Sequence, residues 1–123
     1  MYTLDTNAII YYLKGDEHAI KIITESLKNP LPIYISTITE TELFGFSNLT
    51  TDDSTAIETL LTAFAKIPVD STIARTAGFL RRRYKIKIPD SIIAATALFT
   101  GTTLVTRNVT DFKSIERLSI QKI

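Results

Sequence analysis

The chain has 123 residues, with 14 Lys and Arg against 13 Asp and Glu, one His and no Cys. This length suits a single domain over residues 1–123. The missing Cys excludes disulfides, thiolate nucleophiles and Cys-based metal sites, and the single His argues against His-rich zinc sites and His-dependent triads. The net charge of +1 provides no global field to recruit nucleic acid, so any such binding needs a local basic patch.

No basic-then-apolar leader and no apolar run of membrane-spanning length occurs in the sequence. We therefore expect a cytoplasmic protein with no membrane partner. Pro and Gly are sparse and scattered, so no linker or low-complexity tract divides the chain.

Short β-rich runs alternate with helical patterns in the first half. We expect strands over 2–4 and 33–35 and helices over 7–13 and 17–28. In the second helix, Ile20, Ile23 and Leu27 recur at helical spacing and predict its buried stripe. Thr37 with Glu40 matches a capping box, which predicts a further helix and leaves Glu42 without a structural role.

The same alternation continues in the second half. We expect a helix from Asp52 or Asp53, with a stripe of Ile57, Leu60, Leu61 and Phe64, and a long helix from Ser71 or Thr72, with Ile73, Ala77, Leu80 and Tyr84 inward. Strands are expected over 66–69, 103–106 and 119–123. The first of these contains Pro68, which favours an edge position.

The segment Lys87–Phe99 predicts the most buried helix, ending at Gly101. It is apolar almost all the way round, Phe99 included, which is typical of a helix enclosed in a core. Asp90 lies at its start. Taken alone, this acid reads as an N-cap that accepts backbone N–H groups.

Strands that alternate with helices predict an α/β fold with a mainly parallel sheet, and ligands of such sheets bind beyond the carboxyl ends of the strands. Polar residues gather at those positions. Asp5 ends the first strand, Glu42 follows the second by about one helical turn, Asp90 opens the buried helix, and Asn108 and Asp111 follow the strand over 103–106. We therefore expect these side chains to share one crevice.

Four segments in this order resemble the PIN-domain ribonucleases, and more narrowly the VapC-type toxins of toxin–antitoxin pairs. They are Leu4-Asp5-Thr6-Asn7, Thr39-Glu40-Thr41-Glu42-Leu43, Pro89-Asp90-Ser91-Ile92-Ile93-Ala94-Ala95-Thr96-Ala97 and Val105-Thr106-Arg107-Asn108-Val109-Thr110-Asp111-Phe112. The resemblance runs from Leu4 to Phe112. It implies an α/β/α sandwich around a parallel sheet, and a metal-dependent endoribonuclease that acts as a toxin.

Carried over by position, the resemblance makes Asp5, Glu42 and Asp90 metal ligands and catalytic residues. The fourth position is shared: many members place an acid where this chain has Asn108, while Asp111 lies nearby. Mg²⁺, with Mn²⁺ also accepted, suits this oxygen-rich set. Such an ion polarises the scissile phosphate and lowers the pKa of a bound water. The departure at Asn108 leaves open whether one or two ions bind.

Each residue also has a structural alternative. Asp5 and Asp111 can cap the elements that follow them, and Glu42 can be an ordinary exposed helix residue. Thr6, Asn7 and Thr106 stand beside the acids and are expected to hold the carboxylates in position. For Thr6 and Asn7, helix capping is an equally good interpretation.

Basic residues precede Asp90 and follow the strand over 103–106. Arg82, Arg83, Lys85, Lys87 and Arg107 are the candidate RNA-binding residues. As a rim beside the metal they would contact phosphates, which gives affinity without sequence information. Alternatively, the run at 81–87 is a solvated helix end whose cations complement the helix dipole.

The resemblance also implies partners: RNA as substrate, a homodimeric state, and a VapB-type antitoxin that inserts a peptide near the active site. Tyr11, Tyr12, Phe44 and Phe46 are candidates to line such a groove, although core packing explains most of them as well. Two other functions stay open. One is a PIN-fold binding module that has lost its metal. The other is a Mg²⁺-dependent phosphatase of the haloacid-dehalogenase type, against which Asn7 stands where a second Asp is usual.

Overall fold

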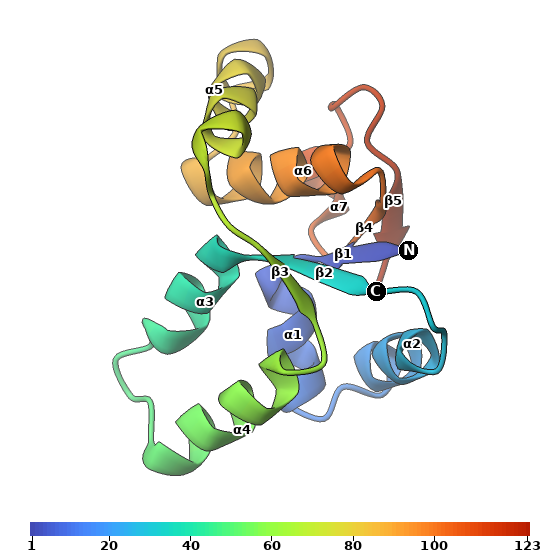
Figure 1. Ribbon diagram of the computed structural model, residues 1–123, viewed down its shortest axis with the longest axis vertical. Helices are drawn as coiled ribbons and strands as arrows, with labels where there is room; N and C mark the ends of the chain where they lie inside the picture. The colour runs from blue at the N-terminus through green and yellow to red at the C-terminus, as the bar shows by residue number, and fades with distance from the viewer.

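A five-stranded sheet forms the centre of the computed structural model, which describes residues 1–123 (Figure 1). Every neighbouring pair of strands is parallel, and the strand order is β3-β2-β1-β4-β5. The strands are β1 (Tyr2–Leu4), β2 (Ile33–Ser36), β3 (Ala65–Ile67), β4 (Thr103–Thr106) and β5 (Ile120–Lys122). The predicted α/β class is confirmed, and β3 lies at an edge as expected from Pro68.

Seven helices cover the two faces of this sheet (Figure 1). They are α1 (Thr6–Leu13), α2 (Glu17–Leu27), α3 (Thr37–Phe44), α4 (Thr51–Leu61), α5 (Ser71–Tyr84), α6 (Ile88–Thr100) and α7 (Val109–Phe112). Helices α1 to α4 lie on one side of the sheet, and α5 and α6 lie on the other. This is the predicted three-layer sandwich. None of the helices combines the length and the apolar character needed to cross a membrane.

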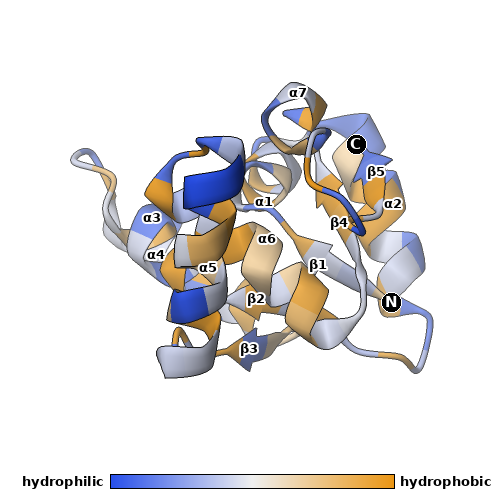
Figure 2. Ribbon diagram, turned by 90° about the horizontal axis from the view of Figure 1, so that it is seen from above, coloured by the Kyte–Doolittle hydropathy of each residue, from blue (hydrophilic) through white to orange (hydrophobic).

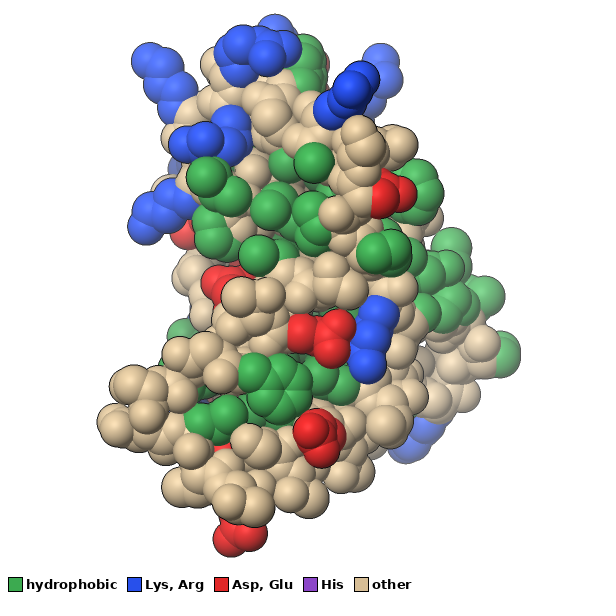
Figure 3. All heavy atoms as spheres, turned by 60° about the vertical axis from the view of Figure 1, so that its left-hand side comes forward, with side chains coloured by type: hydrophobic (Ala, Val, Ile, Leu, Met, Phe, Trp, Pro, Cys, Tyr) green, Lys and Arg blue, Asp and Glu red, His purple; other side chains and the backbone are tan.

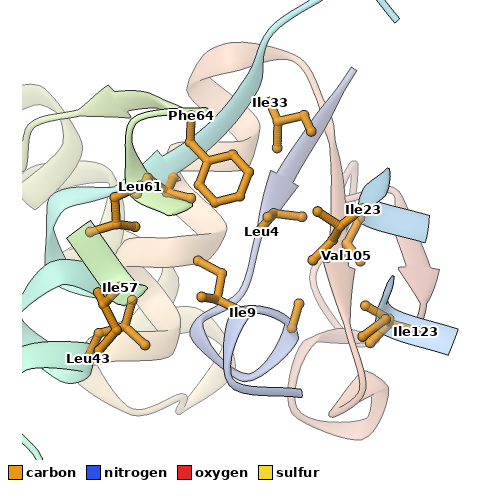
Figure 4. Packing of buried hydrophobic residues seen from close by; sticks show 13 residues of the cluster. Leu4, Ile9, Ile23, Ile33, Leu43, Ile57, Leu61, Phe64, Val105 and Ile123 are labelled. Carbon is orange, nitrogen blue, oxygen red and sulfur yellow. The ribbon is translucent and has the colours of Figure 1, made fainter. Parts of the chain in front are cut away.

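Each face of the sheet has its own hydrophobic core, because successive residues of a strand point to opposite faces. Val105 packs with Leu4 and Ile9 in the core under α1 to α4 (Figure 4). Its neighbour Leu104 packs with Ile93 in the core under α5 and α6. Fully burying one such side chain contributes roughly 1.5–3 kcal/mol. These two cores fix the strand ends that carry the acids.

Helix α6 lies between the sheet and α5 (Figure 2). Every residue from Ser91 to Ala97 is buried, which confirms the predicted enclosed helix. Its C-cap, Gly101, has φ +65, a left-handed conformation that Gly adopts without strain. The expectation for Phe99 was wrong. It is 59% exposed because it lies in the last turn of the helix, beyond this buried stretch.

The structure corrects several predicted helix starts. Lys87, not Asp90, is the N-cap of α6. Ser36, not Thr37, caps α3, because its side chain accepts a hydrogen bond from the Ile38 N–H. Asp70, one residue before the expected Ser71, caps α5. At α3 and α5 two capping residue types are neighbours, and propensity alone does not choose between them. Helix α6 begins at Ile88, before Pro89, and has no side-chain cap, so Asp90 lies inside its first turn.

The start of α4 and the buried face of α2 also differ from the prediction. Thr50 and Asp53 form the capping box that starts α4, one residue earlier than predicted. In α2, Ile23 is buried, but Ile20 and Leu27 are 38% and 40% exposed. The buried face of α2 runs through Ala19 and Ile23 instead, so the helix is rotated relative to the predicted stripe.

Candidate active site

Asp5 lies at the carboxyl end of β1, in the middle of the sheet. Its backbone N–H donates to the Val105 carbonyl at 3.0 Å, which extends the pairing with β4 by one residue. Its carboxylate accepts a 2.8 Å hydrogen bond from the Thr106 hydroxyl and is almost completely buried, with 4% of the residue exposed. Asp5 occupies the N-cap position of α1, yet its side chain makes no capping hydrogen bond. The capping alternative therefore does not explain this acid.

The electrostatic environment of Asp5 opposes its ionisation. The pKa of Asp5 is raised to about 6, mainly by burial, and the Thr106 hydroxyl partly offsets this effect. The nearby charges of Asp90 and Glu42 contribute to the rise, while the Thr6 backbone N–H opposes it. Three predicted site residues from three different elements therefore lie close enough to repel one another.

Glu42 lies on α3 and faces this crevice across from α1. The Thr6 hydroxyl donates to its Oε1 at 2.7 Å, and the same hydroxyl is 3.0 Å from the Thr39 hydroxyl. Glu42 is half-buried, so it is not the ordinary exposed helix residue of the structural alternative. Thr39, which the sequence interpretation did not single out, completes this buried chain of hydroxyl groups.

Asp90 is the third residue of α6 and is half-buried. Burial raises its pKa, and the charges of Asp111 and Glu42 raise it further, while Lys87 lowers it. Asp111 lies in the first turn of α7, and its side chain is exposed. The structure therefore brings Asp5, Glu42, Asp90 and Asp111 into one neighbourhood.

Thr106 connects the backbone of Asn108 to the carboxylate of Asp5. The Asn108 backbone N–H donates to the Thr106 hydroxyl at 3.0 Å, and that hydroxyl in turn donates to Asp5. Asn108 is the N-cap residue of α7, but its side chain makes no capping hydrogen bond and is exposed. Asp111 lies one turn further along α7, on the Asp90 side.

The donor set fits a hard divalent cation. The four acids supply only oxygen atoms, and none of them forms an ion pair with Lys or Arg. No three of them converge closely enough to enclose one ion by themselves. A site of this kind suits an ion that keeps several of its own waters, as Mg²⁺ does. Mg²⁺ or Mn²⁺ bound here would also offset the repulsion between the carboxylates, which contributes to the raised pKa of Asp5.

Pockets open on two sides of the acids. A pocket of about 270 Å³ is lined by Tyr84, Lys85, Ile86, Lys87, Asp90, Thr110, Asp111 and Ser114. A second of about 470 Å³ is lined by Thr6, Asn7, Ile10, Thr41, Glu42, Gly45 and Phe46. Two predicted RNA-binding residues thus share a pocket with two predicted ligands. Tyr84, Thr110 and Ser114 were not predicted, because only the folded chain brings the turn after α5 next to α7.

The other predicted RNA-binding residues lie in different surroundings. Arg82 stacks over the Phe79 ring at 5.8 Å, and Arg83 forms an exposed 3.7 Å ion pair with Glu116. Arg107 has close partners within the protein. Its guanidinium donates to both carboxylate oxygens of Asp16 and lies 3.8 Å from the centre of the Tyr11 ring. These contacts hold the guanidinium beside Asp16 and Tyr11, and its role in binding phosphate stays a prediction.

An apolar groove of about 860 Å³ lies between α1, α3 and α4, next to the Glu42 side of the site. Its lining includes Tyr11, Leu43, Phe46, Leu49 and Ile57. Two of the four predicted aromatics, Tyr11 and Phe46, therefore line this groove. Tyr12 packs partly against the core instead, and Phe44 is 37% exposed outside the groove lining.

Comparison with known proteins agrees with this architecture. The family model of the PIN domain matches residues 2–118. Over 123 aligned positions the chain is 32% identical to Ribonuclease VapC10 of Mycobacterium tuberculosis H37Rv, covering 96% of this chain and 90% of the relative. It is 31% identical to Ribonuclease VapC19 of the same strain, covering 91% and 92% of the two chains.

Solved structures give the same result. A chain of VapBC2 from Rickettsia felis, bound to a DNA fragment from the promoter, superimposes with a TM-score of 0.86 at 27% identity, covering 99% of this chain and 98% of that one. A toxin–antitoxin complex from Klebsiella pneumoniae gives 0.83 at 30% identity and covers both chains completely. With its matching sheet, its acids at the carboxyl ends of the strands and these relatives, the chain belongs to the PIN-domain family.

Proposed function

We propose that this chain is a metal-dependent endoribonuclease and the toxin of a type II toxin–antitoxin pair. The observation that carries the proposal is Asp5, an acid that is 4% exposed, close to Glu42 and Asp90, and without a cationic partner. Burying such a carboxylate costs free energy unless a cation compensates it. Two relatives named as VapC ribonucleases and two toxin–antitoxin structures support the same activity.

The residues would divide the work as follows. Asp5 and Asp90 would be the main ligands of Mg²⁺ or Mn²⁺, Glu42 a ligand or the group that orients the attacking water, and Asp111 a support for a second ion. When bound, the ion supplies Lewis-acid polarisation of the phosphate and a bound water of lowered pKa. Asn108 can contribute only a neutral amide oxygen at this corner.

Hydroxyl groups hold the carboxylates in position. Thr106 donates to Asp5 at 2.8 Å and Thr6 donates to Glu42 at 2.7 Å. A charged acceptor makes these hydrogen bonds stronger than those between neutral groups. Asn7, the third predicted supporting residue, lines the pocket beside Glu42. It makes no side-chain hydrogen bond to a carboxylate, so its contribution would be to the pocket wall.

Cleavage of total RNA is the direct test. Wild-type protein with Mg²⁺ or Mn²⁺ should produce defined new ends, and Asp5→Asn and Asp90→Asn should each reduce cleavage to background. Glu58→Gln, an exposed change on α4, is the matched control and should cut normally. Circular dichroism and thermal melting must show that every variant is folded. Full activity in folded Asp5→Asn or Asp90→Asn contradicts the proposal.

The non-catalytic alternative retains one supporting observation, the neutral and exposed Asn108. Calorimetric titration with Mn²⁺ separates the two. A catalytic domain should bind the ion with an affinity that falls in Asp90→Asn, whereas a module that has lost its metal gives no binding in either protein. Membership of the PIN family removes the support for a haloacid-dehalogenase-type phosphatase.

The proposed partners follow from the same family. A VapB-type antitoxin would place an apolar segment in the groove lined by Tyr11, Leu43 and Phe46, next to the acids. We also propose that the chain forms a homodimer and acts in the cytoplasm, where its RNA substrate is found. Light scattering tests the first point, because a dimer should give twice the mass of 13.7 kDa. A monomer at high concentration contradicts it.

A further inference from the structure

Two lysines line the pocket that also contains Asp90 and Asp111. Lys85 and Lys87 belong to the turn between α5 and α6, and α7 forms the opposite wall with Thr110 and Asp111. We propose that this pocket binds a backbone phosphate of the RNA next to the one that is cut, with Lys85 and Lys87 as its cationic ligands. The inference rests on the proposed function, since it assigns one side of the active site to the substrate backbone.

Both ammonium groups remain unpaired. Neither Lys85 nor Lys87 forms an ion pair within 4.0 Å, although Asp90 and Asp111 line the same pocket. By contrast, Arg83 is paired with Glu116 and Arg107 with Asp16. The two lysines therefore keep their charge for a ligand. Figure 3 shows Lys and Arg side chains gathered at the end of the molecule where α5 ends.

The backbone at Lys85 is a second observation. Lys85 is the C-cap of α5 and has φ +56, in the left-handed region where Gly is the usual residue. A side chain in this conformation is strained, and Gly would remove the strain. A lysine at this position adds strain to the fold and places its charge in the wall of the pocket. A requirement for the cation accounts for that choice.

Neutral donors complete the pocket. The Tyr84 hydroxyl accepts hydrogen bonds from the Arg83 side chain and from the Glu116 backbone N–H, both at 3.2 Å. Its own proton therefore remains available for a ligand. Thr110 and Ser114 add two more hydroxyl groups. Hydroxyl groups and ammonium groups together are the usual protein contacts to phosphate oxygens.

The pocket on the other side of the acids has a different character. It is lined by Asn7, Glu42 and Phe46 among others, and by no Lys or Arg. An anionic phosphate has no cationic partner there, whereas an exposed aromatic ring suits a base. The difference between the two pockets therefore assigns the backbone phosphate to the side of Lys85 and Lys87.

Salt dependence of RNA binding is the test. The probe is a fluorescein-labelled single-stranded RNA of 20 mixed nucleotides, and all variants carry Asp5→Asn to prevent cleavage. Binding to single strands weakens with a log–log salt slope of about 0.7 per phosphate neutralised. The double variant Lys85→Gln, Lys87→Gln should flatten the slope by at least that amount. Lys28→Gln, an exposed change at the end of α2, should leave the slope unchanged.

A pair of glycine substitutions separates charge from backbone strain. Arg117 is the other non-Gly residue with a positive φ, +67, and it does not line the pocket. Lys85→Gly and Arg117→Gly each remove one positive charge and one strained side chain. Neither should lower the melting temperature, and only Lys85→Gly should weaken RNA binding and flatten its salt slope.

The outcomes are distinguishable from failure of the proposed function. If wild-type protein cuts RNA but the lysine variants keep the wild-type salt slope, the phosphate pocket is wrong and the nuclease stands. Equal effects of Lys85→Gly and Arg117→Gly also overturn the pocket, because they indicate general charge rather than a site. Protein that binds RNA through these lysines without cutting it keeps the pocket and overturns the nuclease.

Discussion

Buried threonines occur at both ends of the parallel sheet, but their hydroxyl groups have different hydrogen-bond partners at the two ends. At the amino end, the hydroxyl groups of Thr3, Thr100 and Thr102 bond only to one another and to the backbone, with Thr3 and Thr102 2.6 Å apart. At the carboxyl end, Thr106 donates to the charged group of Asp5. The first arrangement is neutral and complete. The second holds a charge that the protein itself does not compensate.

This comparison indicates where the fold gives up stability. Hydrogen bonds between neutral buried groups satisfy polar atoms and contribute modestly to folding. A buried carboxylate without a cation is unfavourable even when a hydroxyl donates to it. The amino end of the sheet therefore only stabilises the domain, whereas the carboxyl end contains a functional site that lowers the stability of the fold. The following predictions separate the two ends, beginning with the largest effect.

The first prediction concerns the pH dependence of stability without metal. The pKa of Asp5 is raised to about 6, from 3.8, so the folded state holds a proton that the unfolded state releases earlier. Stability should therefore be unaffected by this group below pH 3.8, fall between about pH 4 and 6, and stay reduced above. The full loss is about 3 kcal/mol, at about 1.4 kcal/mol per pKa unit.

Asp5→Asn removes this loss and keeps an oxygen acceptor for the Thr106 hydroxyl. In EDTA at pH 7.5, urea denaturation should find Asp5→Asn more stable than wild type, with a smaller difference at pH 4.5. Asp90→Asn should change stability in the same direction but by less, because Asp90 is only half-buried. Parallel pH profiles for wild type and Asp5→Asn would show that this buried acid does not cost stability.

The second prediction compares the same substitution, Thr→Val, at the two ends of the sheet. Thr106→Val removes the donor to Asp5, and such a loss behind a metal ligand lowers metal affinity or activity about 10- to 100-fold. Thr102→Val removes a donor of the neutral trio and should cost about 1–3 kcal/mol of stability while leaving cleavage unchanged. RNA cleavage and urea denaturation of both variants measure the contrast.

The control for this exchange is Thr106→Ser, which keeps the hydroxyl group and should retain most of the activity. If Thr102→Val reduces cleavage as much as Thr106→Val does, the two ends do not differ in function. If Thr106→Val cuts at the wild-type rate, the hydroxyl does not position Asp5.

Sequence patterns predicted the features of the fold and the site that follow from the order of strands and helices along the chain. The strand ends at Asp5 and Thr106, and the apolar helix that begins near Asp90, follow from local periodicity. Parallel connections then require the acids to meet at one edge of the sheet. The raised pKa values of Asp5 and Asp90, which their neighbouring acids help to raise, agree with that expectation.

The parts that failed depend on contacts between distant segments. Nothing local distinguishes Phe99, which lies beyond the buried stretch of α6, from the buried residues before it. The phosphate pocket needs the turn at Lys85 to meet Ser114 on the far side of α6. Likewise, no pattern near Arg107 indicates that Asp16 lies within hydrogen-bonding distance of its guanidinium.

The third prediction, with the smallest effect, concerns Arg107 at the carboxyl end. Arg107 donates to the Ile123 carbonyl as well as to Asp16, and Asp16 also caps α2. Its contacts therefore tie β4 to α2 and to the last residue described. Arg107→Lys keeps the charge but loses the paired geometry and the stacking on Tyr11. It should lower the melting temperature slightly and leave the salt slope of RNA binding unchanged.

A double-mutant cycle with Asp16→Asn decides whether Arg107 acts through this pair. If the two groups stabilise the domain together, the double variant should melt near the temperature of the less stable single variant, because the second change removes a bond already lost. Additive losses in melting temperature would contradict the pairing. A flattened salt slope of RNA binding in Arg107→Lys would indicate that Arg107 contacts RNA phosphates. The contrast with Lys85 and Lys87 is then the informative one. All three are candidate RNA-binding cations, but Arg107 is paired with Asp16, whereas Lys85 and Lys87 have no ion-pair partner in the protein and are free to bind a phosphate.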